Sequence, residues 1–171
     1  MRAIPLTVTA LAAALLLTAC DDGGNKNGSR PDSACQIGGV SMQIGSASVA
    51  PAAGDTGEIP VSITNQSTPC TLDHFPAAAL GTDSGNAKVP VLKGAKAQKL
   101  KLAKGDSASF TISYVRGKEG DKSSLAVKTV KITLPDSDSI RTYPWPYGPV
   151  ARQGAGTTPN ASVSAFQQVG D

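Results

Sequence analysis

The sequence is poor in charge, in aromatic side chains and in histidine, and each shortage narrows what the chain can do. Only 17% of its 171 residues are charged and 4% are aromatic, so a hydrophobic core must be built mainly from aliphatic side chains. One histidine and three cysteines nearly exclude a zinc site with several Cys and His ligands. A formal net charge of +3 is too small to make nucleic acid the expected partner.

No motif supplies a complete catalytic site. A serine-nucleophile signature such as Gly-x-Ser-x-Gly is absent, and Asp73-His74 is the only adjacent acid–imidazole pair. Adjacent residues on a strand point to opposite faces, which argues against a dyad of these two. Copper held by His74 and Met42 would need more ligands than the chain supplies. We therefore expect no catalysis, no metal and no cofactor.

The alternative to a non-enzymatic protein is an envelope enzyme or metal-handling protein that works through Asp73 and His74. The two interpretations differ in the surroundings that they require. An active site would place His74 in a concave pocket with other polar side chains. A surface histidine would not need one.

The first twenty residues have the pattern of an export signal. Arg2 supplies one positive charge, and residues 3–17 are apolar apart from threonine. Leu17-Thr18-Ala19-Cys20 resembles the lipobox of bacterial lipoproteins, in which the cysteine takes acyl chains such as palmitate and the peptide is cut just before it. A membrane-spanning helix and an ordinary cleaved signal are the alternatives, and the position of Cys20 favours the lipobox.

These features divide the chain into three parts. We predict a lipoprotein signal peptide over residues 1–19, a lipidated Cys20 with a flexible linker over 20–34, and a folded domain over 35–171. Residues 21–33 lack hydrophobic side chains, so they cannot bury enough surface to offset the entropy lost on ordering. Two acyl chains would anchor the mature protein on the outer face of the cytoplasmic membrane.

Beyond Cys35 the apolar residues recur with period two, which predicts strands. Gly, Pro, Asp or Asn bounds each short run, which indicates an antiparallel sandwich or barrel. Leu125 and Val127 are out of phase with the run that follows, so we expect a bulge near Lys128-Thr129. The alternating positions are Ile59, Val61 and Ile63; Leu100 and Leu102; Phe110, Ile112 and Tyr114; and Val130, Ile132 and Leu134.

Two cysteines remain after Cys20, and such a pair in an exported domain usually forms a disulfide. Strands near residues 41–49 and 58–64 would form a hairpin that turns around residues 52–55 and places Cys35 and Cys70 at its open end. The bridge would close a long loop and contribute about 4 kcal/mol in the chain-entropy model. We predict a structural rather than a redox or metal-binding role for this pair.

A longer pattern surrounds the second cysteine. Residues 65–76 read Asn-Gln-Ser-Thr-Pro-Cys-Thr-Leu-Asp-His-Phe-Pro, and residues 100–110 read Leu-Lys-Leu-Ala-Lys-Gly-Asp-Ser-Ala-Ser-Phe. With the early Cys35, this resembles the family of unknown function catalogued as 4232, secreted and lipid-anchored proteins common in actinobacteria. The resemblance covers roughly Cys35 to Leu134. It implies an immunoglobulin-like β-sandwich outside the membrane, and it implies no reaction.

The chain departs from that family pattern in two ways. Residues 74–77 read His-Phe-Pro-Ala, where Gly-Tyr-Pro-Gly is frequent in the family. A second cysteine pair that many members carry is also absent. A ligand recognised by this loop can therefore differ from one member to another.

A lysine cluster is the first candidate binding feature. No acidic residue lies between Gly85 and Gly105, the segment that holds it. The cluster would be attracted to anionic lipid headgroups or cell-wall polymers by about 1 kcal/mol per lysine. A solvated strand face, or an edge protected against aberrant pairing, is the interpretation that we favour. The cluster consists of Lys88, Lys93, Lys96, Lys99, Lys101 and Lys104.

An aromatic and proline-rich segment is the second candidate. Tyr143, Trp145 and Tyr147 share one face of an extended chain, and the intervening prolines confine the segment to an edge strand or a polyproline-like stretch. These three side chains are candidate contacts for a sugar or a partner. We favour a core role, with Trp145 largely buried against one end of the sandwich.

Asp136-Ser137-Asp138 is a candidate Ca²⁺ site, but two carboxylates in this setting more often make a turn. The sequence as a whole predicts a non-enzymatic lipoprotein whose domain binds another envelope protein or a cell-wall polymer. No nucleic-acid partner is expected.

Overall fold

The computed structural model describes residues 33–169, so the predicted signal peptide, Cys20 and residues 20–32 of the predicted linker lie outside the described residues. Within residues 33–169, no helix is long and apolar enough to cross a membrane. The elements are η1 (Ile37–Gly39), β1 (Val40–Ile44), β2 (Thr56–Asn65), β3 (Cys70–Leu72), β4 (Ala77–Thr82), β5 (Gly85–Val89), β6 (Leu100–Leu102), β7 (Ser107–Val115), β8 (Ser124–Leu125), β9 (Thr129–Thr133), β10 (Ile140–Pro144), β11 (Val150–Ala151), β12 (Ala161–Val163) and β13 (Gln167–Val169).

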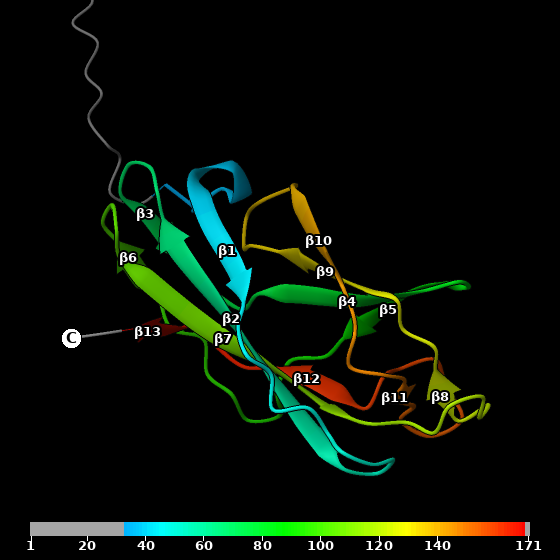
Figure 1. Ribbon diagram of the computed structural model, residues 1–171. Coiled ribbons are helices and arrows are strands. Elements are labelled where there is room, and N and C mark those ends of the chain that lie inside the picture. The colour runs from blue at the N-terminus through cyan, green and yellow to red at the C-terminus, as the bar shows by residue number, and fades with distance from the viewer. Residues whose placement is uncertain (1–32, 170–171) are drawn as a thin grey trace, which may run out of the picture.

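Two larger antiparallel sheets enclose the core. One runs in the order β1-β2-β7-β12, with β13 also paired to β7, and the other runs β10-β9-β4-β5. Figure 1 shows β2 and β7 side by side as the longest strands, with β4, β5 and β9 crossing them. Short pairs, β3 with β6 and β8 with β11, complete the two ends. The prediction of an antiparallel β-sandwich with one disulfide is confirmed; the immunoglobulin-like connectivity stays a prediction.

The alternating runs of the sequence place their apolar side chains in the core. Ile59, Val61 and Ile63 of β2 are fully buried, and they lie in register with buried residues of β7. Removing one such side chain from water contributes about 1.5–3 kcal/mol. The inner positions of β9 and β4 cover this layer from the other sheet. The period-two pattern therefore identified the faces correctly.

The first strand is shorter than predicted, because Pro60 lies opposite its end. β1 stops at Ile44 rather than continuing to Val49. Gly45 still donates to the Pro60 carbonyl at 2.9 Å, but proline has no N–H to donate in return. The ladder lapses there and resumes only as an isolated bridge between Ser48 and Glu58. The prediction of a continuous strand over 41–49 was wrong.

The break in phase near Lys128 is a change of sheet and not a bulge. Leu125 belongs to β8, which pairs with β11, whereas Val130 belongs to β9 in the four-stranded sheet. Between them the Lys128 N–H donates to the Gly81 carbonyl, and its own carbonyl accepts from Trp145. Each apolar run keeps its own period because each packs in a different sheet. The predicted bulge was wrong.

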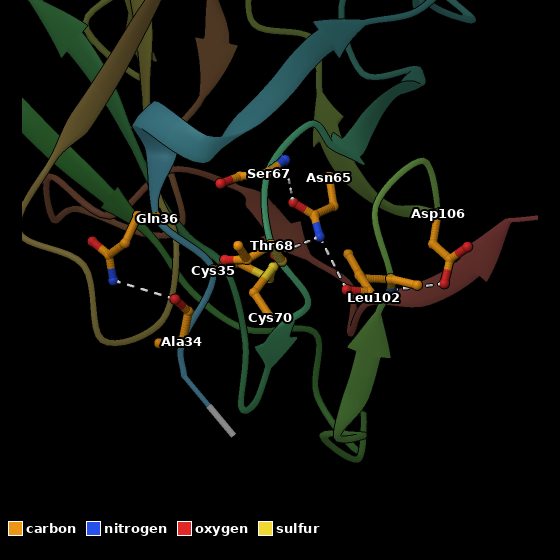
Figure 2. Close-up of a disulfide and its surroundings, with 10 residues drawn as sticks. Ala34, Cys35, Gln36, Asn65, Ser67, Thr68, Cys70, Leu102 and Asp106 are labelled. Carbon is orange, nitrogen blue, oxygen red and sulfur yellow. Dashed lines mark hydrogen bonds between the residues drawn. A yellow bond between two sulfur atoms is a disulfide. The ribbon is translucent and has the colours of Figure 1, made fainter. Parts of the chain in front are cut away.

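The disulfide joins Cys35 to Cys70 beside the first described residues, with 4.9 Å between the two Cα atoms. Its surroundings are ordered by Asn65, which is buried. The Asn65 amide donates to the Thr68 and Leu102 carbonyls at 2.9 and 3.0 Å and accepts from the Ser67 N–H (Figure 2). This side chain therefore shapes the loop that delivers Cys70. The predicted pairing is confirmed.

Contacts link the two larger sheets along both sides of the sandwich. On one side the Tyr143 hydroxyl of β10 donates to the Met42 carbonyl of β1 at 2.8 Å. On the other, Val91 forms a bridge with Val163 of β12, so the chain leaving β5 covers that edge. Side chains and a loop thus link the two sheets where strand pairing stops.

Candidate functional site

Asp73 and His74 lie in a bend after β3 and not on a strand. His74 has a positive φ of 67°, and its N–H donates to the Asp73 carboxylate at 2.8 Å. The imidazole Nδ1 is 3.6 Å from the same carboxylate oxygen, so the expectation that the two side chains point apart was wrong. The other Asp73 oxygen is 3.9 Å from the Lys99 ammonium. His74 keeps 75% of its side-chain surface exposed, so water screens these interactions.

The hollow next to His74, of about 630 Å³, is mainly apolar. Phe75, Pro76 and Val91 supply most of its walls, and Lys88 and Thr158 supply the polar side chains besides His74. No carboxylate or thiol lines it. Asp73, the carboxylate nearest to the imidazole, therefore stands outside the hollow.

The described residues contain no group of three or more His, Cys, Asp or Glu side chains that could hold a metal ion. Met42, the other ligand considered for copper, is buried in the core. Asp136 and Asp138 lie in the turn between β9 and β10, where both are exposed and Asp136 has a positive φ of 54°. The turn interpretation of that segment fits this geometry.

Trp145 lies in the core, as predicted, with 5% of its surface exposed. Its indole N–H donates to the Gly148 carbonyl at 2.7 Å. The Tyr114 and Tyr147 rings both pack edge-on to it, with centroids 5.2 and 5.0 Å from the indole. Gly57 makes room for this cluster, because a Cβ there would collide with the Tyr114 ring. Trp145 is therefore packed in the core and is not available at the surface to a ligand.

Tyr143 and Tyr147 are half-buried and pack against the core. Burial raises the pKa of Tyr143 above its ordinary value, and the nearby Arg141 acts in the opposite direction. Burial also raises the pKa of Tyr147, and Tyr114 adds to that effect. β10 is the edge strand of its sheet, as the prolines predicted.

The six lysines between Gly85 and Gly105 are all exposed but do not share one surface. Lys88 stands on β5, Lys101 on β6, and the loop between these strands carries three others. Lys99 is near Asp73, as described above. The cluster in sequence is therefore divided between two sheets.

A groove of about 550 Å³ lies at the β8–β11 end and carries charges of both signs. Asp83 is paired there with Lys128, and Arg152 donates to the Ser124 carbonyl at 3.3 Å. Hydrogen bonds from the Ser123 backbone and hydroxyl lower the pKa of Asp121 at its rim. The groove could not be predicted from the sequence, because its lining comes from segments far apart in the chain: residues 82–84, 118–128, 148–149 and 152.

A protein-family model matches most of the described domain. The family model described as "Domain of unknown function (DUF4232)" matches residues 35–167. The chain belongs to this family. The match begins at the disulfide cysteine Cys35 and ends in β13, so the DUF4232 domain includes both larger sheets and the aromatic cluster. No curated protein matches the chain.

Proposed function

We propose that this DUF4232 protein is a lipid-anchored lipoprotein outside the cytoplasmic membrane, and that its sandwich is a non-enzymatic module that binds another envelope component. The observation that carries the location is the buried Cys35–Cys70 disulfide. Such bonds persist in oxidising compartments. The Leu17–Cys20 sequence upstream supplies the means of anchoring.

The absence of enzyme activity is proposed from the surroundings of the only histidine. His74 is largely exposed, and its neighbouring hollow is lined by apolar side chains. Among residues 33–169, Asp73 is the acidic residue paired with it, and Asp73 also lies near Lys99. A general base acts on a substrate held beside it and needs a defined partner set, which this bend does not provide. The envelope-enzyme alternative is therefore the weaker proposal.

Anchoring is tested with Cys20→Ser in bacterial cells that process lipoproteins. Wild-type protein should incorporate an alkyne-labelled palmitate and remain in the membrane fraction. The variant should lose the label and appear in the medium or as an uncleaved precursor. The control is the double variant Cys35→Ala/Cys70→Ala, which lacks the other two thiols and should still be labelled. Unchanged labelling and fractionation of Cys20→Ser would refute the anchor.

Binding is tested by incubating the purified full chain with insoluble envelope material from the same cells and measuring co-sedimentation. The expected result is saturable binding, with no release of soluble fragments from the envelope material. Absence of saturable binding would refute the binding role. Hydrolysis of envelope material that His74→Ala abolishes would establish the enzyme alternative instead.

A further inference from the structure

Within residues 33–169, the elements leave the outer face of the four-stranded sheet open, with Thr142 and Lys88 exposed and Lys131 and Ala79 partly exposed. Its pairing register places Thr142, Lys131, Ala79 and Lys88 in one row across β10, β9, β4 and β5. Neighbouring strands lie about 4.8 Å apart, so the two lysines stand on either side of a single alanine. Because the side chain of Ala79 is only a methyl group, it leaves open the space between the side chains of Lys88 and Lys131.

The outward positions of this face include two lysines and no aspartate or glutamate. The adjacent outward positions are Ile140, Thr133 and Ala77 on one side of the row, and Thr129, Gly81 and Asn86 on the other. Within residues 33–169, neither Lys88 nor Lys131 forms an ion pair with a carboxylate. The acids near the sandwich end, among them Asp83 and Asp121, line the separate groove at β8 and β11. Lys88 and Lys131 stand two strand spacings apart, about 10 Å, so an anion between them can interact with both ammonium groups.

Two adjoining hollows give the face its shape. One, of about 320 Å³, lies over Ala79 between Lys88 and Lys131 and reaches Ile140. The other is the hollow of about 630 Å³ beside Phe75, and the two share Ala77 and Lys88. Their lining combines apolar surfaces with the threonine hydroxyl of the sheet, the Asn86 amide and the lysines. Both are open, so an occupant would lie along the surface.

We propose that this sheet face binds an extended anionic polysaccharide of the cell envelope, with carboxylate or phosphate groups between Lys88 and Lys131. The proposal rests on the proposed function and names the envelope component. Sugar rings present apolar C–H faces and hydroxyl edges, which match the Phe75 and Val91 surfaces and the Thr133 and Asn86 polar groups. Anionic substituents match the two lysines.

A glycan fits this face better than a membrane or an acidic peptide. The chain enters the domain beside β3, and β5 lies at the opposite side of the molecule (Figure 1). The predicted tether therefore attaches to the domain away from this face. An acidic peptide would add a strand to a sheet edge, whereas Lys88 and Lys131 stand on the face of the sheet and are separated by β4.

The experiment measures binding of the full chain, purified in detergent, to polygalacturonate, a polymer of uronic acid sugars. Neutral dextran and poly-L-glutamate of similar length serve as comparison probes. We expect saturable binding to polygalacturonate, weaker binding to poly-L-glutamate, and none to dextran. Lys88→Gln/Lys131→Gln should lower the affinity about tenfold or more. Ala79→Leu, which fills the space without changing charge, should also weaken binding.

The control double variant is Lys104→Gln/Lys122→Gln, which removes the same charge from exposed lysines outside this face. It should bind within about twofold of wild type. An equal loss of affinity in both double variants would mean that binding depends on net charge alone, and it would overturn the proposed site. Preference for poly-L-glutamate, or for phosphatidylglycerol vesicles, would overturn the glycan. The readout does not depend on acylation, so failure of the Cys20 anchor and failure of this site are distinguishable.

Discussion

The Tyr143 hydroxyl donates a hydrogen bond of 2.8 Å to the carbonyl of Met42, which joins the edge strand of one sheet to the edge strand of the other. Met42 lies at a non-hydrogen-bonded position opposite Ile63, so its carbonyl points away from β2, and among residues 33–169 no strand pairs with that side of β1. Two residues earlier on β10, Arg141 donates to the Ile37 carbonyl at 3.2 Å. β10 therefore closes this side of the sandwich with side chains instead of a backbone ladder.

Tyr143→Phe should destabilise the domain by about 1 kcal/mol, because it removes a half-buried hydrogen bond and leaves the Met42 carbonyl without that donor. Chemical denaturation with a single transition would measure the change. Thr142→Ala is the matched control, since Thr142 is exposed on the opposite face of the same strand. It should stay within about 0.5 kcal/mol of wild type. Equal stability of Tyr143→Phe and wild type would contradict this role.

Alkaline pH should weaken the fold through the same residue. The pKa of Tyr143 is raised in the folded state, chiefly by burial, so the folded protein retains a proton that the unfolded chain releases. This contribution is complete below the ordinary tyrosine pKa of about 10 and is lost as the pH rises through the folded value. Denaturation between about pH 8 and about pH 11 should show a smaller decline for Tyr143→Phe than for wild type. Parallel declines would mean that Tyr143 makes no contribution, although Tyr147, whose pKa is also raised, would retain its own.

Trp145→Ala should cost about 3–5 kcal/mol, because it opens a cavity among Tyr114, Tyr147 and the surrounding core. Wild-type Trp fluorescence should be that of a buried indole and should shift to longer wavelength on unfolding. Ile140→Ala provides the control, since Ile140 is 59% exposed and should change stability by about 0.5 kcal/mol or less. A stable Trp145→Ala domain would contradict the core role.

Reduction of the disulfide should lower stability by about 4 kcal/mol in the chain-entropy model, because Cys35 and Cys70 are separated by 35 positions. Mass spectrometry of the non-reduced protein should show a peptide linking the two. The melting temperature should fall on reduction of wild type, whereas reductant should leave Cys35→Ala/Cys70→Ala unchanged. Two free thiols in protein taken from the envelope would contradict the bond.

Local pattern was sufficient to predict much of this fold. The alternation of Ile59, Val61 and Ile63 identified a half-buried strand, and the number of remaining cysteines identified the disulfide. The burial of Trp145 followed from its place in an aromatic row, which more often covers the end of a sandwich core than forms a site, and the flanking prolines predicted the edge position. These inferences depend on neighbours within a few residues.

The failures share a dependence on pairing between distant segments. The end of β1 is set by Pro60, whose effect appears only once the hairpin register is known. β8 and β9 look like one interrupted strand until their partners, β11 and β4, are known. The lysine pair on the four-stranded sheet was missed for the same reason. Lys131 and Lys88 share one face only because β9 and β5 both pair with β4.

The closed side of the sandwich also bears on how copies of this protein behave beside one another. A strand edge with free carbonyls and N–H groups is a template on which a second chain can add, and repeated addition produces aggregates. Tyr143 and Arg141 occupy carbonyls along β1 and η1, and Pro60 ends the ladder nearby. If the protein is anchored as we propose, confinement to a plane raises the rate at which neighbours collide. The capped edge then allows a dense surface layer of separate, individually folded domains.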